Sequence, residues 1–146
     1  MATKEELART HALVQAVLAL SERMRRHYAA RVEEFELTPT QAHLLRELAP
    51  GPRPMGELAG RLACDASNVT GLTDRLEARR LVERRAAPAD RRVKVLALTA
   101  EGERVQRALW KRLMTDSPVA AGLDREDQRV LLELLQRVVG DERPSC

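Results

Sequence analysis

Apolar side chains recur at helical spacing along most of this chain of 146 residues. Between residues 4 and 34 the repeat predicts one long helix. Its apolar positions include Leu7, Val14, Val17, Leu18, Met24, Tyr28 and Val32. A helix of that length is long for one small domain, so we expect it to bury surface against a partner subunit as well as its own core.

Capping residues and chain breaks divide the helical pattern that follows. Thr38-Pro39-Thr40-Gln41 combines a capping Thr, a first-turn Pro and a Gln at the capping-box position, and predicts a helix to about residue 49. PGPRP at 50–54 breaks it, and a short helix follows. The inward positions of this short helix are Met55, Leu58, Ala59 and Leu62. Asp65 is expected to cap the next helix, which ends near Arg80.

The pattern then changes to short runs of β type. LVERR (81–85) and VKVLALT (93–99) predict a two-stranded hairpin with its tip near Ala87–Arg92. Thr99 caps a helix over about 99–116, and a last helix opens at Leu123-Asp124. The inward positions are Val105, Leu109 and Leu113 in the first, and Val130, Leu131, Leu134, Leu135 and Val138 in the second. This order predicts a mainly α fold of the α+β type.

The helix over 65–80 has an apolar side and a flat polar side. On a helical wheel Val69, Leu72 and Leu76 cluster, and the short polar residues lie opposite. These are Ser67, Thr70, Gly71 and Asp74, with Arg75 at their edge. A low face of hydrogen-bonding groups fits the major groove of B-DNA, where long side chains would hold the backbone away. The alternative is an ordinary exposed helix, because Ser and Asn also favour helix starts.

The charge balance supports an anionic partner in the same region. Residues 61–94 contain nine Lys or Arg and five Asp or Glu, a net charge of +4, whereas the whole chain carries +3. Arg91 and Arg92 stand at the hairpin tip, where an Arg can enter the minor groove. Asp90 is expected to pair with a neighbouring Arg and hold the hairpin in shape. The alternative for all three is a solvated turn.

Other functions find little support in the composition. Aromatic residues make up only 2% of the chain, which argues against stacking of single-stranded bases. Three histidines and two cysteines form no metal-ligand, disulfide or catalytic pattern, so we expect no enzyme, cofactor or metal site. Neither a signal-peptide pattern nor a membrane-length apolar run is found, so we expect a cytoplasmic protein with no membrane contact.

The order of motifs resembles the MarR family of transcriptional regulators over nearly the whole chain. LAGRLACDASNVTGLTDRLEARRLVERR resembles the recognition segment of that family. DRRVKVLALT, followed by TAEGE, resembles its wing and the helix after it. The family's Asp-x-Arg and Leu-Thr are matched by Asp90, Arg92 and Leu98-Thr99.

The resemblance implies a homodimer on palindromic double-stranded DNA. It implies a winged helix-turn-helix over 38–98, with dimerisation helices over 1–35 and 99–146. By position it assigns Ser67, Asn68, Thr70 and Arg75 to the major groove, and Arg92, with Arg91 beside it, to the minor groove.

It also implies a repressor released by a small phenolic or carboxylate effector. The residues that can line the effector cleft are His27, Tyr28, Arg31 and His43, although a single His on a half-buried helix is more often structural. Other family members sense oxidants through a cysteine of the first helix, which this chain lacks. Cys64, at the start of the recognition helix, where a helix dipole favours a thiolate, gives a redox-sensing alternative.

Overall fold

The computed structural model describes residues 3–62 and 66–140 of the chain. These residues form the helices α1 (Lys4–Glu33), α2 (Pro39–Leu48), α3 (Met55–Arg61), α4 (Ala66–Ala78), α5 (Ala100–Thr115) and α6 (Arg125–Val139). The strands are β1 (Arg53–Pro54), β2 (Val82–Ala86) and β3 (Lys94–Leu98). The predicted fold class, mainly α with a β-wing, is confirmed.

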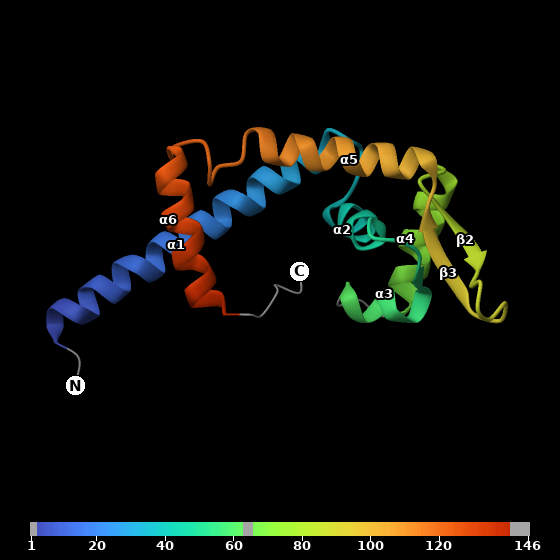
Figure 1. The fold of residues 1–146 in the computed structure, drawn as a ribbon, viewed down its shortest axis with the longest axis horizontal. Helices are drawn as coiled ribbons and strands as arrows, with labels where there is room; N and C mark the ends of the chain where they lie inside the picture. The colour runs from blue at the N-terminus through green and yellow to red at the C-terminus, as the bar shows by residue number, and fades with distance from the viewer. Residues whose placement is uncertain (1–2, 63–65, 141–146) are drawn as a thin grey trace.

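The elements separate into two parts that α1 and α5 connect (Figure 1). Helices α2, α3 and α4 gather with the β2–β3 hairpin at one end of the molecule, and α1 projects away from them. Helix α5 leads from the hairpin back along the end of α1, against which it packs. No helix within the described ranges has the length and apolarity that crossing a bilayer requires.

The sheet has one strand more than the sequence predicted. Its order is β1-β3-β2 and both pairings are antiparallel, with Arg53 opposite Leu96 and Val82 opposite Leu98. The sequence predicts only a helix break over residues 50–54. A two-residue strand carries no alternating pattern, and Pro54, which lacks an N–H, is tolerated because β1 lies at the sheet edge.

The predicted caps are present wherever the structure describes them. The Thr38 hydroxyl accepts the Gln41 N–H at 3.2 Å, and the Gln41 side chain accepts the Thr38 N–H at 2.8 Å. Thr99 caps α5 and Asp124 caps α6 through a side-chain oxygen, which accepts the N–H of Gly102 at 3.0 Å and of Asp127 at 2.9 Å. Asp65, the expected cap of α4, lies outside the described residues.

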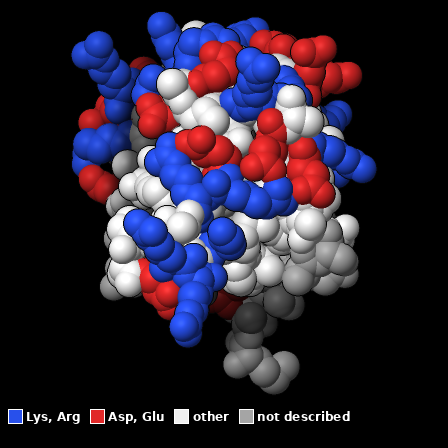
Figure 2. Space-filling view, turned by 90° about the vertical axis from the view of Figure 1, so that its right-hand side faces the viewer, with Lys and Arg blue, Asp and Glu red and all other residues white. Residues whose placement is uncertain are grey.

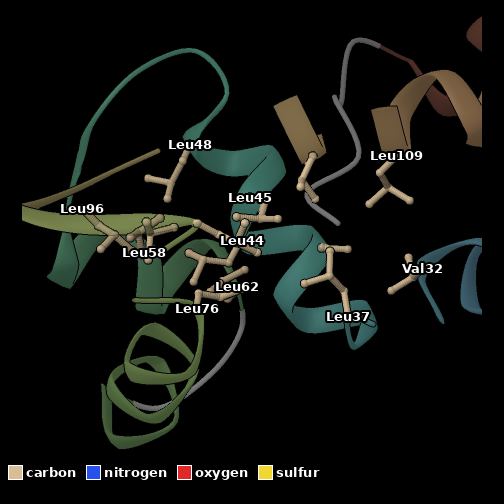
Figure 3. Close-up of a cluster of buried hydrophobic side chains, with 14 of the residues drawn as sticks. Val32, Leu37, Leu44, Leu45, Leu48, Leu58, Leu62, Leu76, Leu96 and Leu109 are labelled. Carbon is tan, nitrogen blue, oxygen red and sulfur yellow. The ribbon is translucent and has the colours of Figure 1, made fainter. Parts of the chain in front are cut away.

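The hydrophobic core lies between α2, α3, α4 and the sheet (Figure 3). Its fully buried side chains include Val32, Leu44, Leu45, Leu58, Leu76 and Leu96. Of the inward positions predicted for α3 and α5, Leu58, Leu62, Val105, Leu109 and Leu113 are buried, and Met55 and Ala59 pack against the core. The core fixes α4 against α3 and leaves the outer side of α4 uncovered.

Two apolar surfaces have no cover from the residues that the structure describes. In the first half of α1, Val17 and Leu18 are 55% and 58% exposed to solvent. Helix α6 has no buried residue within the described chain, and its Val138 is 85% exposed. These surfaces are the predicted stripes that the chain itself does not bury.

The start of α5 is held tightly against the base of the hairpin. Thr99 donates its N–H to the Leu81 carbonyl at 3.1 Å and its hydroxyl to the Arg80 carbonyl at 2.5 Å. A Cβ added at Gly102 would lie 1.8 Å from the Leu81 carbonyl oxygen. Only glycine therefore allows α5 to approach so closely.

Gly102→Ala is expected to lower the free energy of unfolding by about 2–3 kcal/mol, because its methyl group would force backbone apart. Urea denaturation measures the loss. Gly60→Ala in α3 is the control, since its Cβ would meet no atom within 4 Å and should be neutral or stabilising by up to about 1 kcal/mol. Equal midpoints for the two variants would show that the contact at Gly102 is not tight in solution.

Candidate nucleic-acid interface

Helix α4 presents one polar face to solvent. Val69 and Leu76 of α4 are buried in the core, and Thr73 is buried beside them. The opposite side of α4 exposes Asn68, Thr70, Gly71, Asp74 and Arg75. The structure therefore has the two-sided helix that the sequence predicted. Ser67 belongs to α4, but its side chain lies outside the described part of the chain.

Arginines that the sequence analysis did not single out hold α4 in place. Arg79 donates to the carbonyls of Phe35 and Glu36, at 3.0 and 2.5 Å, in the turn after α1. Arg84 of β2 forms ion pairs with Asp74 and Glu77. Sequence spacing could not reveal these contacts, because the partners lie on different elements.

The hairpin tip is closed by Asp90. Its carboxylate accepts the Arg92 N–H at 2.9 Å, and its carbonyl accepts the Val93 N–H at 3.0 Å. The expected pairing with a neighbouring arginine therefore takes the form of a bond to the backbone of Arg92. This bond holds the turn without occupying the guanidinium group.

The nine cations of residues 61–94 divide into two groups. Arg61, Arg79, Arg84 and Arg85 bind carboxylates or carbonyls of the chain. The other five are exposed and form no ion pair with any residue that the structure describes. They are Arg75, Arg80, Arg91, Arg92 and Lys94.

Four of these five cations lie toward the outer end of the hairpin or beside the polar face of α4. Arg91, Arg92 and Lys94 lie toward the outer end of the hairpin, and Arg75 lies at the edge of the polar face of α4. Arg80 precedes the opposite end of the hairpin, next to the Val82–Leu98 pair. Figure 2 shows this side of the molecule, where Lys and Arg side chains cover much of the surface and one group of them lies at the lower left, the level of the hairpin tip in Figure 1.

A cavity of about 490 Å³ lies between α1, α2 and the end of α3. It is lined by Met24, Arg25, Tyr28, Pro39, Thr40, His43, Arg46 and Leu62. Tyr28 and His43, two of the four predicted effector residues, thus both line the cavity. Arg25 and Arg46 were missed, although each lies three residues from a predicted one, a spacing that shares a helix face.

The other two predicted effector residues lie in a contact between α1 and α5. The His27 imidazole is 3.1 Å from the Leu113 carbonyl oxygen, and Arg31 pairs with Asp116 at 2.5 Å. Arg31 also pairs with Glu34, which Arg112 binds at 2.9 Å. Hydrogen bonds from Arg112 and Arg31 hold the pKa of Glu34 below its usual value. Neither His27 nor Arg31 lines the cavity.

His43 faces the cavity as a neutral group at neutral pH. Burial lowers the pKa of His43, and the charge of Arg46 lowers it further, whereas Glu47, 3.6 Å away, opposes the shift. The buried Nε2 atom of His43 makes no hydrogen bond within the described structure.

Within residues 3–62 and 66–140, no group of three His, Cys, Asp or Glu side chains could hold a metal ion. Cys64, on which the redox alternative rests, lies outside the described residues.

Asp90→Ala is expected to weaken DNA binding about three- to tenfold, because the turn that presents Arg92 loses its side-chain bond. Asp90→Asn is the matched control. Its amide oxygen can accept the same N–H, so affinity should be kept, or rise slightly with the loss of a negative charge. Fluorescence anisotropy with an operator duplex measures both. If Asn weakens binding as much as Ala, the carboxylate charge matters and not the turn.

The chain is similar to known proteins both in sequence and in fold. The MarR family model matches residues 35–93. The HTH-type transcriptional regulator YsmB of Bacillus subtilis is 38% identical over 101 residues, 62% of this chain and 69% of YsmB. Wild-type MarR of E. coli without ligand superposes with a TM-score of 0.75 at 22% identity, over 87% of this chain and 96% of MarR. A mutant of the same MarR complexed with operator DNA gives 0.66 at 21% identity, over 88% and 94%.

Proposed function

The chain belongs to the MarR family of transcriptional regulators, and on that basis we propose that it is a homodimeric repressor that binds specific sequences in double-stranded DNA. The observation that carries the proposal is the clustering of unpaired cations at the hairpin tip beside the exposed polar face of α4. The proposed DNA-binding part is residues 38–98.

Helix α4 supplies the proposed major-groove contacts. Asn68, Thr70 and Arg75 lie on its exposed side, and Ser67 precedes them. Amide, hydroxyl and guanidinium groups match the donors and acceptors of base edges in that groove. Small neighbours such as Gly71 let the helix backbone come close. These residues therefore set sequence preference in the proposal.

The hairpin supplies the proposed minor-groove contact. The Asp90 bond presents Arg92 at the tip with its guanidinium group unpaired within the described chain, and Arg91 is exposed beside it. A thin loop with an uncompensated Arg suits a narrow, electronegative minor groove. Arg92 is thus proposed to read groove shape, with Arg91 contacting the backbone.

The exposed apolar surfaces of α1 and α6 support a dimer. A helix of 15 residues with no buried side chain is marginal in water, so α6 requires a second surface to pack against. We assign residues 1–35 and 99–146 to a twofold interface. Two recognition helices related by a twofold axis would then meet an inverted repeat.

Wild-type protein is expected to select an inverted repeat from random duplex DNA and to bind it as two chains per site. Arg92→Ala should weaken that binding about tenfold and make log K less steep against log salt by about 0.9, the value of one phosphate-equivalent contact. Arg107→Ala is the control, because it removes an equal charge from the exposed face of α5. Binding titrations over a salt series measure all three proteins.

Unchanged affinity of Arg92→Ala at every salt concentration would remove the hairpin from the DNA interface. Arg75→Ala should behave differently and change which sequences are preferred, since a helix residue reads bases. A wild-type protein that selects no sequence would contradict the proposed function as a whole.

The cavity beside α2 supports effector control as the second part of the proposal. Its lining combines apolar Met24 and Leu62 with cationic Arg25 and Arg46, and contains no acid among the described residues. Such a lining suits a small phenolic or carboxylate compound. An occupant would contact Leu62 at the end of α3, and α3 packs against α4.

Benzoate and phenol, used as probes, are expected to raise the melting temperature of the wild type and to weaken operator binding. His43→Leu should lose the response to one or both probes, because it removes the polar group at the cavity wall. His11→Gln, on the exposed first half of α1, should keep it. Equal responses in both variants would place the effector elsewhere, and no response in the wild type at millimolar concentration would reject these two classes.

A further inference from the structure

The recognition helix carries more negative than positive charge. Residues 66–78 contain Asp74 and Glu77 but only one cation, Arg75. Asp74 lies on the exposed face that is proposed to enter the major groove. An uncompensated carboxylate at that position would repel DNA phosphates, so the helix needs a cation from elsewhere.

Arg84 supplies that cation from the neighbouring strand. Its Nη2 donates to Asp74 Oδ1 at 2.6 Å, and its Nη1 donates to Glu77 Oε2. The backbone N–H of Arg84 donates to Glu77 Oε1 at 3.3 Å. The side chain is 32% exposed, and it bridges helix and strand at the surface.

The contact joins the hairpin to the C-terminal half of α4. Asp74 and Glu77 are three residues apart, which places them on one side of the helix, and Arg84 is central in β2 opposite Leu96. A planar guanidinium group can bind two carboxylates at once, which a lysine ammonium on a flexible stem does less well. The Asp74 bond, ahead of the Glu77 charge, raises the pKa of Arg84.

We propose that Arg84 is a positioning residue for DNA binding, which pairs with both carboxylates of the recognition helix, balances the net charge of that helix and fixes the hairpin at one angle to it. The inference rests on the proposed function and deepens it. Arg84 acts through Asp74 and Glu77 and makes no phosphate contact, in contrast to Arg92. The separation between major-groove and minor-groove contacts is therefore set by a contact inside the protein.

A double-mutant cycle on the selected operator tests this inference. Arg84→Gln should weaken binding about tenfold in the wild-type background. In a background of Asp74→Asn with Glu77→Gln, the same change should cost less than twofold and leave the salt slope unchanged, because no carboxylate remains to be neutralised. The Asn and Gln oxygens can still accept hydrogen bonds, so that background itself should bind at least as well as the wild type.

Arg85→Gln is the matched control. Arg85 neighbours Arg84 on the same strand, but it pairs with Glu83 of that strand and not with α4. Its loss should change affinity less than threefold. Affinities are measured well below each melting temperature and corrected for the active fraction, so a loss of stability alone does not count as a loss of binding.

If Arg84→Gln weakens DNA binding by the same factor in both backgrounds and lowers the salt slope by about 0.9 in each, Arg84 contacts a phosphate directly and the inference is overturned. An Arg84→Gln protein that binds as well as the wild type would also overturn it. If Arg84→Gln does not fold, weaker binding by the folded Asp74→Asn, Glu77→Gln protein would overturn it, and equal or tighter binding would support it. A wild type without sequence preference would reject the proposed function as well.

Discussion

The burial of one side of α4 in the core is the interaction on which the other features depend. Val69 and Leu76 pack with Leu58 and the side chains of α2, and they fix both the position of α4 and its rotation about its axis. Because one side is buried, the polar residues at the intervening positions must face solvent. The polar face is therefore exposed because the opposite side of α4 is buried, and no further contact is needed to orient it.

Arginine has several different roles in the DNA-binding part. Arg79 and Arg84 are bound to carbonyls or carboxylates and hold elements together, whereas Arg75 and Arg92 have no ion pair within the described residues. A net charge cannot distinguish these roles, because each arginine counts the same. The positive charge available to a polyanion comes from the arginines that form no ion pair within the described residues.

The helices, their caps and the hairpin could be predicted because they depend on short-range signals, such as the Thr38–Gln41 capping box and the apolar spacing in α5. Strand β1 could not, because two residues carry no period and its pairing with β3 joins positions more than 40 residues apart. For the same reason His27 and His43 looked equivalent in the sequence. One lies against the Leu113 carbonyl, and the other lies on a cavity wall.

Because Gly102 packs directly against the Leu81 carbonyl, α5 and the base of the hairpin are rigidly joined. With 16 residues, α5 is about 24 Å long, so a tilt of about 5° at its far end displaces the hairpin by roughly 2 Å. That far end is held to α1 by Arg31, Asp116 and Arg112. In the proposed dimer this geometry makes α5 a lever arm, so that a small adjustment in the ion-pair cluster would change the distance between the two DNA-binding parts.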